Sequence, residues 1–320
     1  MNNVVRWGVL GNAMIARDFM IPAMEASPLC RVTAVASRSA VPADLAPEAA
    51  HYDSYEALLR DPEVDAVYVP VPNALHARWS IEAMRHGKHV LCEKPMACNA
   101  ETGRHMVQAA EENGVLLMEA FMYRYGGQFR RMMEILDSGV LGPISAMYGC
   151  HGYTLNWRSP AREDPALGGG CLYDVGCYVV DVMNAVMQRQ GAQPAACSAV
   201  MRMKNGVDWN TAAWLRYDNG VVGSLQCWFD AAQEQRVVVA GEKGTLVVPH
   251  LFEGTGGSLY LTAGGRTETL QAKEDNPYRL EAEAFSRAVL GQSGECMPLA
   301  HTIQNLRTLE CLYNNSIQEE

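Results

Sequence analysis

The first 120 residues alternate short apolar runs with helix-like stretches, and this alternation constrains the fold more than any other feature of the chain. Helix-like stretches such as residues 75–86 and 101–113 end at Gly87 and Gly114, which are typical stop signals. The apolar runs predict strands at residues 4–10, 31–36, 66–69, 88–91 and 115–118. Strands that alternate with helices form a parallel, doubly wound α/β sheet.

The pattern changes after residue 122. From Ala195 to Leu270 the chain reads as successive strands, and Tyr217-Asp218-Asn219-Gly220 predicts a hairpin turn between two of them. Such runs without intervening helices predict one large, open, mostly antiparallel sheet. Because 320 residues exceed the usual size of a single core, we expect two domains, 1–122 and 123–320, the second of the α+β class.

Composition narrows the class of protein. A net charge of -10 and a pI of about 5.3 argue against a nucleic-acid surface, which needs a basic stripe. No apolar run reaches the length of a membrane span, and the N-terminal residues do not resemble a signal peptide. The ten cysteines form no Cys-x-x-Cys pair, so neither a zinc site nor a disulfide framework is indicated. We therefore expect a cytoplasmic chain with reduced thiols and no membrane partner.

A glycine-containing loop follows the first predicted strand. Its sequence fits G-x-G-x-x-G/A with alanine at the second and third glycine positions, and its first residues are Gly11, Asn12, Ala13, Met14 and Ile15. A tight turn, small residues and a helix N-terminus are what a pyrophosphate needs. The loop therefore predicts a dinucleotide-binding domain of the Rossmann type, with an ordinary strand–helix turn as the alternative.

The second strand ends in Ser37-Arg38, where an NAD enzyme usually carries an acidic residue. An arginine accommodates a 2′-phosphate, so we expect NADP in preference to NAD. Alternatively, Arg38 stacks on adenine and NAD remains possible. Pro70, Pro72 and Asn73 follow the third strand, where the ribose and nicotinamide would pass. His76 is either a cofactor contact or a capping or surface histidine.

Lys94 closes the fourth strand within Cys92-Glu93-Lys94-Pro95. A lysine at the carboxyl end of a buried strand is costly unless it has a partner or a task. Ligands bind outside the carboxyl ends of strands in open α/β sheets. Lys94 is therefore a candidate catalytic residue, and a salt bridge to Glu93 is the alternative.

A second group of chemically active residues follows the glycines at 168–170. If residues 172–188 are helical, Asp174 and Tyr178 share one face, and Asp181 lies on roughly the same face. We expect a polar pocket wall there. The alternatives are a helix cap for Asp174, a core tyrosine for Tyr178 and a supporting acid for Asp181.

Together these motifs resemble the Gfo/Idh/MocA oxidoreductases. The shared features, in order, are Gly11-x-Ala13, Ser37-Arg38, Glu93-Lys94-Pro95, residues 118–124, the glycine triplet and Asp174-Val175-Gly176-Cys177-Tyr178. The resemblance implies a Rossmann domain, a C-terminal domain that binds substrate and whose open sheet forms a dimer face, and a cis Lys94–Pro95 bond. It implies a homodimer or homotetramer. Tyrosine at position 178, where many members have histidine, resembles the branch of NADP-dependent sugar dehydrogenases and keto-sugar reductases.

The resemblance also implies roles. Tyr178 would exchange the hydroxyl proton, Lys94 would stabilise its phenolate, and Asp174 would bind another hydroxyl or orient Lys94. Glu93 would position the cofactor or Lys94, and Tyr278 would close over the site. Arg124 and Arg162 would reach the nicotinamide or the substrate, with a surface salt bridge as the alternative for each. The implied activity is hydride transfer between nicotinamide and a sugar or polyol. The alternatives are a trans-dihydrodiol dehydrogenase, a catalytically silent cofactor-binding regulator and an NAD-dependent glycosidase, against which Tyr178 counts.

Overall fold

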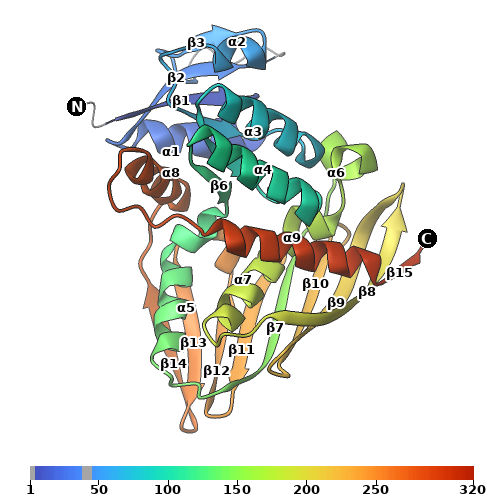
Figure 1. Cartoon of the computed structure of the whole chain (residues 1–320). Coiled ribbons are helices and arrows are strands. Elements are labelled where there is room, and N and C mark those ends of the chain that lie inside the picture. The colour runs from blue at the N-terminus through green and yellow to red at the C-terminus, as the bar shows by residue number, and fades with distance from the viewer. Residues whose placement is uncertain (1–3, 38–44) are drawn as a thin grey trace. The chain divides into compact units, whose positions relative to one another are not determined.

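The computed structural model describes residues 4–37 and 45–320, and its contacts divide the chain into two units (Figure 1). The first comprises Met1–Met122 and Tyr278–Ile303, and the second Tyr123–Pro277 and Gln304–Glu320. The domain bounds 1–122 and 123–320 expected from the sequence stay a prediction. The expected division has a single boundary, whereas in the structure residues 278–303 also belong to the first unit. The reason is that a helix late in the chain packs with the first sheet.

The first unit is built on a six-stranded, all-parallel sheet in the order β3-β2-β1-β4-β5-β6. The strands are β1 (Val5–Leu10), β2 (Cys30–Ala36), β3 (Ala50–Tyr52), β4 (Ala66–Val69), β5 (His89–Glu93) and β6 (Leu117–Ala120). This is the order of the Rossmann fold, and it reverses between β1 and β4. Loops that follow those two strands therefore lie where such sheets bind ligands. The short strand β3 had no recognisable signal in the sequence.

The helices of this unit begin and end as their local sequences dictate. Asn99 accepts a hydrogen bond from the Thr102 amide (2.8 Å) and caps α4, and Gly114 ends it in the left-handed conformation. The helices are η1 (Ala16–Met20), α1 (Ile21–Glu25), α2 (Tyr55–Leu59), η2 (Asn73–Leu75), α3 (His76–Arg85), α4 (Ala100–Asn113) and most of α8 (Pro277–Val289). In Figure 1, α3 and α4 lie side by side, as their contacts confirm.

The second unit is built on a nine-stranded sheet in the order β14-β13-β12-β11-β7-β10-β9-β8-β15. Its strands are β7 (Ile144–Gly152), β8 (Pro194–Lys204), β9 (Val207–Tyr217), β10 (Val222–Trp228), β11 (Glu234–Gly241), β12 (Gly244–Pro249), β13 (Gly257–Ala263), β14 (Arg266–Ala272) and β15 (Ser316–Glu319). Neighbours are antiparallel except β7 with β10 and β8 with β15. The predicted hairpin turn joins β9 to β10, with Gly220 at φ 88°.

The described helices that pack on this sheet cover one of its faces, and we call the opposite face the uncovered face. Helices α5 (Gly127–Asp137) and α7 (Cys177–Gln188) pack on the covered face. The remaining helical segments are η3 (Met122–Tyr125), α6 (Pro160–Glu163), η4 (Pro165–Leu167), η5 (Leu172–Gly176), η6 (Leu251–Glu253) and α9 (Leu299–Asn314), of which α9 begins in the first unit. On the uncovered face, register places one residue from each of six neighbouring strands in a row, namely Trp214, Ser224, Tyr148, Val238, Val247 and Tyr260.

Two findings modify the expectations from composition. Within the described residues, the helical stretch Pro165–Gln188 is long and apolar enough to cross a membrane, although no such run was expected. Of its most apolar window, 72% is buried inside the protein, as in a core helix. Cys197 and Cys311 form a disulfide that links β8 to α9, so the expectation of reduced thiols is wrong for this pair. Their separation of 114 residues gave no sequence signal.

Candidate active site

The glycine loop has the conformation that dinucleotide binding requires. Gly11 has φ 124°, which side chains rarely adopt, and its amide donates to the Ala36 carbonyl of β2 (2.8 Å). The Arg17 amide donates to the Ala13 carbonyl (3.0 Å), so the helix begins within the loop. Met14 is half-exposed, and Asn12, Ala13 and Ile15 are partly exposed. The loop therefore offers backbone and a helix start at the point where the strand order reverses.

The neighbouring loops carry the other predicted cofactor residues. The Ser37 amide donates to the Tyr52 carbonyl of β3 (3.1 Å), which holds the end of β2. Arg38 lies outside the described residues. Pro70 and Pro72 follow β4, and Asn73 begins η2, with the Leu75 amide donating to the Pro72 carbonyl (2.8 Å). These residues follow strands that neighbour β1 on either side.

His76 is a buried structural bridge in this unit. Its Nδ1 lies 2.9 Å from the Pro95 carbonyl and its Nε2 lies 2.8 Å from the Val71 carbonyl. Burial lowers the pKa of His76 to about 4, so the ring is neutral near pH 7. A neutral ring has a single N–H group, which it donates to one of these two carbonyls. His76 ties the turn after β5 to the loop after β4, which is neither the capping nor the surface role considered from the sequence.

Lys94 lies in a firmly held turn at the end of β5. The Lys94–Pro95 bond is cis, as the resemblance implied. Tyr68 of β4 donates a short hydrogen bond to the Glu93 carboxylate, and the Met96 amide donates to Glu119 Oε1 (2.8 Å). Lys94 itself is half-buried. These contacts orient the lysine at the carboxyl edge of the parallel sheet.

In the second unit, a buried carboxylate holds the start of the helix that bears Asp174 and Tyr178. Asp208 of β9 accepts from the Leu172 amide (2.7 Å), Thr211 Oγ1 (3.0 Å) and Tyr313 Oη (2.6 Å). A Cβ on Gly170 would lie 2.0 Å from Asp208 Oδ1, so only glycine fits there. Sequence reasoning missed Asp208, whose only signal was an acid inside a strand.

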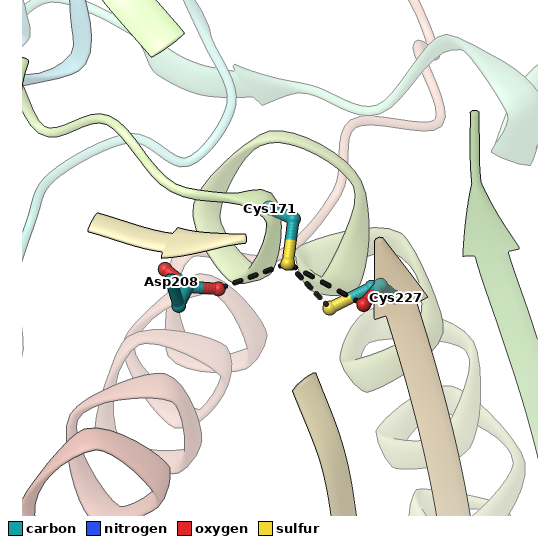
Figure 2. A group of neighbouring side chains, drawn as sticks. All are labelled: Cys171, Asp208 and Cys227. Atoms are coloured by element: carbon teal, nitrogen blue, oxygen red, sulfur yellow. Dashed lines mark hydrogen bonds between the residues drawn. The ribbon is translucent and has the colours of Figure 1, made fainter. Parts of the chain in front are cut away.

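Asp208 also belongs to a buried cluster with Cys171 and Cys227, whose sulfur and carboxylate atoms point toward one another (Figure 2). Cys171 Sγ lies 3.1 Å from Asp208 Oδ2 and 3.6 Å from Cys227 Sγ. Burial raises the pKa of both thiols, so they are protonated near pH 7. Because the carboxylate oxygens already accept hydrogen bonds, we interpret the cluster as a support for the helix and not as a metal centre.

Asp174 lies in η5, a π-helical turn that precedes α7, and it is paired. Its Oδ2 accepts from Arg162 Nε (2.8 Å) and from Tyr153 Oη (2.7 Å). The charge of Asp174 outweighs burial and raises the pKa of Arg162, which therefore stays charged. The Tyr153 ring stacks on Trp157 with 5.6 Å between centroids and 8° between planes. The loop between β7 and η5 thus places an ion pair beside an aromatic pair.

Tyr178 lies one turn after Asp174, in the first turn of α7. Both side chains are half-buried, as expected for residues on one face. The Tyr178 ring contacts Tyr123, His151 and Phe252, with centroids 5.8, 5.3 and 5.5 Å away. This aromatic cage fixes the ring direction, and sequence reasoning missed His151 and Phe252.

Asp181 is fully buried and does not share the half-exposed face of Asp174 and Tyr178, contrary to the expectation from i+7 spacing. It accepts from Tyr123 Oη, from Arg124 Nε (2.7 Å) and Nη2 (2.9 Å), and from Asn305 Nδ2 (2.6 Å). This matches the supporting role considered for it. Arg124, predicted near cofactor or substrate, thus directs two of its N–H groups to a carboxylate of its own unit.

Tyr278, the last predicted contact, lies in α8 of the first unit, where its ring packs 5.3 Å from that of Phe19 in η1. The structure therefore groups the predicted residues into two sets. The cofactor loops, Lys94 and Tyr278 lie in the first unit, whereas Asp174, Tyr178, Arg124 and Arg162 lie in the second.

Comparisons with known proteins match both units. Residues 5–121 match the oxidoreductase family with an NAD-binding Rossmann fold, and residues 129–247 match the GFO/IDH/MocA C-terminal domain. The chain belongs to the GFO/IDH/MocA oxidoreductase family. The expected family, the Rossmann domain with its open-sheet partner and the nicotinamide-dependent oxidoreductase class are thereby confirmed.

Relatives in this family are similar over most of the chain. A D-xylose 1-dehydrogenase (NADP(+)) of Haloferax volcanii is 34% identical over 97% of each chain. A mouse trans-1,2-dihydrobenzene-1,2-diol dehydrogenase is 33% identical and covers 78% of this chain and 76% of its own. The solved structure of KijD10, a 3-ketoreductase from Actinomadura kijaniata in complex with NADP and TDP-benzene, superimposes with a TM-score of 0.90 at 29% identity over 99% of each chain.

Proposed function

We propose that this oxidoreductase prefers NADP and transfers a hydride between nicotinamide C4 and a CH–OH carbon of a sugar or sugar derivative. The observation that carries the proposal is the partly exposed helix face with Tyr178 and Asp174, beside the Arg162 ion pair and the Trp157 ring. This face combines a proton carrier, hydroxyl-binding groups and an apolar surface. Relatives named for xylose and keto-sugar substrates support it.

In this proposal Tyr178 exchanges the substrate hydroxyl proton, and Lys94 makes that exchange possible. A tyrosine has a pKa near 10, and an adjacent ammonium favours the phenolate. Lowering that pKa by about 2–3 units corresponds to about 3–4 kcal/mol. Lys94 also stabilises alkoxide charge on the substrate oxygen. KijD10 has been solved with a lysine replaced and with a tyrosine replaced, and these two positions have the same separation along its chain as Lys94 and Tyr178.

The substrate would lie on the aromatic pair. Trp157 is 47% exposed and stacks on Tyr153, whose hydroxyl donates to Asp174. The apolar face of a pyranose ring fits an exposed indole, while its hydroxyls reach Asp174 and Arg162. A trans-dihydrodiol ring suits the same indole, so a dihydrodiol dehydrogenase is the second candidate, supported by the mouse relative.

A substrate panel tests the function. Aldoses, keto-sugars and trans-diols are offered with NADP+ or NADPH, and turnover is followed at the nicotinamide absorbance. The proposal predicts turnover of at least one sugar class, with NADP preferred over NAD. Turnover of diols alone would favour the second candidate. NADPH binding, read by fluorescence, without any turnover would contradict both and favour a silent regulator.

We also propose that the chain forms a cytoplasmic homodimer through the uncovered face of its large sheet. Apolar side chains project from this face, including Trp214, Tyr148, Val222, Tyr260, Val200 and Ile317, and each is at least one-third exposed. Contiguous exposed apolar surface of this kind is typical of an interaction site. A twofold pairing of identical faces would bury it, and two such dimers would make a tetramer.

A further inference from the structure

Glu281 is a buried carboxyl group that the proposed mechanism does not use. It lies in α8, which is anchored in the first unit by the hydrogen bond from Trp7 Nε1 to Ser286 Oγ (3.2 Å) and by the packing of Phe285 on Trp7. The side chain is 0% exposed. Neither carboxyl oxygen has a hydrogen-bond partner among the residues that the structure describes. Burying an ionised carboxylate without a partner costs folding free energy, so a buried, unpaired Glu281 needs a physical explanation.

The titratable groups that interact electrostatically with Glu281 are acidic. Glu93 at the end of β5 interacts with it electrostatically, and so do Tyr68 of β4 and Cys296 after α8. Tyr278 on the same helix also interacts with Tyr68. Glu93 accepts the Tyr68 hydroxyl and immediately precedes Lys94, so Glu281 interacts with the carboxylate next to the predicted catalytic lysine.

Two carboxyl groups that share a buried site do not both ionise. Burial and the charge of Glu93 both raise the pKa of Glu281 well above its ordinary value. Glu93, by contrast, accepts hydrogen bonds from the Tyr68 hydroxyl and the Lys94 amide, which stabilise its anion. The negative charge of the pair therefore belongs on Glu93.

We propose that Glu281 is a positioning residue that holds a proton in the working enzyme, so that the Glu93–Glu281 pair carries a single negative charge behind Lys94. The assignment to Lys94 rests on the proposed function. A second negative charge at this point would hold the Lys94 ammonium more tightly and repel the anionic cofactor. Ionisation of Glu281 at alkaline pH thus lowers the activity of the enzyme.

Infrared spectroscopy of the full chain, labelled with carbon-13 glutamate, detects the proton directly. The wild type should show a protonated carboxyl band at neutral pH, and Glu281→Gln should lose it. Glu283→Gln is the matched control and should retain the band, because Glu283 lies on the same helix but pairs with Arg287. In Glu93→Gln the band should remain at neutral pH, because Glu281 is still buried, but it should be lost at a lower pH on alkaline titration than in the wild type, because the repulsion from Glu93 is gone. A band that persists in Glu281→Gln, or a band that titrates at the same pH in Glu93→Gln as in the wild type, would overturn the proposal.

Stability and activity give two further readouts. The unfolded chain releases this proton near pH 4.3 while the folded chain keeps it, so stability falls as pH rises above that value until Glu281 ionises in the fold. Glu281→Gln should remove this loss of stability, which is measured as the decrease of Tm with rising pH. The same variant should shift the alkaline limb of the pH profile of kcat/KM to higher pH, whereas Glu283→Gln should change neither quantity. A Tm slope unchanged in Glu281→Gln would contradict the proposal. The infrared band and the Tm slope do not need turnover, so their outcome is separable from failure of the proposed function.

Discussion

At the scale of single residues, reactive side chains were easier to recognise in the sequence than the residues that contact and support them. Lys94, Asp174 and Tyr178 could be proposed as site residues from the sequence because each is a reactive side chain beside a strand end or a glycine run. The residues that support Asp174 and Tyr178 were not, since Asp208, His151 and Phe252 contact the helix with these two residues only through the fold. Asp181 shows the limit of helical spacing: it lies near Asp174 in sequence, yet the protein interior and Arg124 surround it.

Arg38 is predicted to select the cofactor. Its guanidinium would bind the 2′-phosphate, which NAD lacks, so Arg38→Ala should raise the KM for NADP at least tenfold more than the KM for NAD. Initial rates with each cofactor at saturating substrate measure both constants. Arg60→Ala, which removes an exposed arginine at the end of α2, is the control. Equal changes in both KM values for Arg38→Ala would contradict the assignment.

At the scale of elements, the start of the helix with Asp174 and Tyr178 depends on one buried carboxylate. Helical spacing predicted this helix, but not the π-helical turn at residues 172–176 with which it begins. A π-helical turn contains one more residue than an α-helical turn and is frequent at functional sites. No residue type in the sequence predicts where such a turn occurs. Asp208 and Gly170 fix this turn through a contact that only the strand order creates.

Asp208→Asn tests that dependence. The amide cannot accept from both the Leu172 amide and the Tyr313 hydroxyl, so the variant should lose about 1–3 kcal/mol of unfolding free energy. We also expect lower kcat with a smaller change in the KM for NADP, because the perturbed helix carries Tyr178. Urea unfolding and steady-state rates measure these effects. Asp218→Asn, at the exposed hairpin turn, should change stability by less than about 0.5 kcal/mol, and an equal loss in both variants would contradict the role of Asp208.

At the scale of the whole molecule, the Rossmann unit could be predicted because its strand–helix alternation and glycine loop are local signals. The course of residues 278–303 could not, since their return to the first unit depends on contacts such as Trp7 with Ser286, 279 positions apart. The disulfide between Cys197 and Cys311 has the same origin. Long-range pairings of this kind leave no pattern in the sequence around either residue.

The uncovered sheet face is predicted to hold the assembly together. Trp214→Arg places a charge in the middle of that face, and we expect it to convert the dimer into monomers of 35.1 kDa. Sedimentation equilibrium over a range of protein concentrations measures the mass. Leu116→Arg, an exposed apolar position in the first unit, should leave the dimer intact. A wild-type chain that is monomeric at all concentrations would contradict the assembly.

The most direct test of the central claim is the turnover number of Tyr178→Phe with the best substrate of the panel. The phenyl ring keeps the contacts with Tyr123, His151 and Phe252, so NADPH affinity and Tm should stay close to those of the wild type. Without the hydroxyl that exchanges the proton, kcat should fall by about 10²–10⁴. An unchanged kcat would remove Tyr178 from the chemistry and contradict the account.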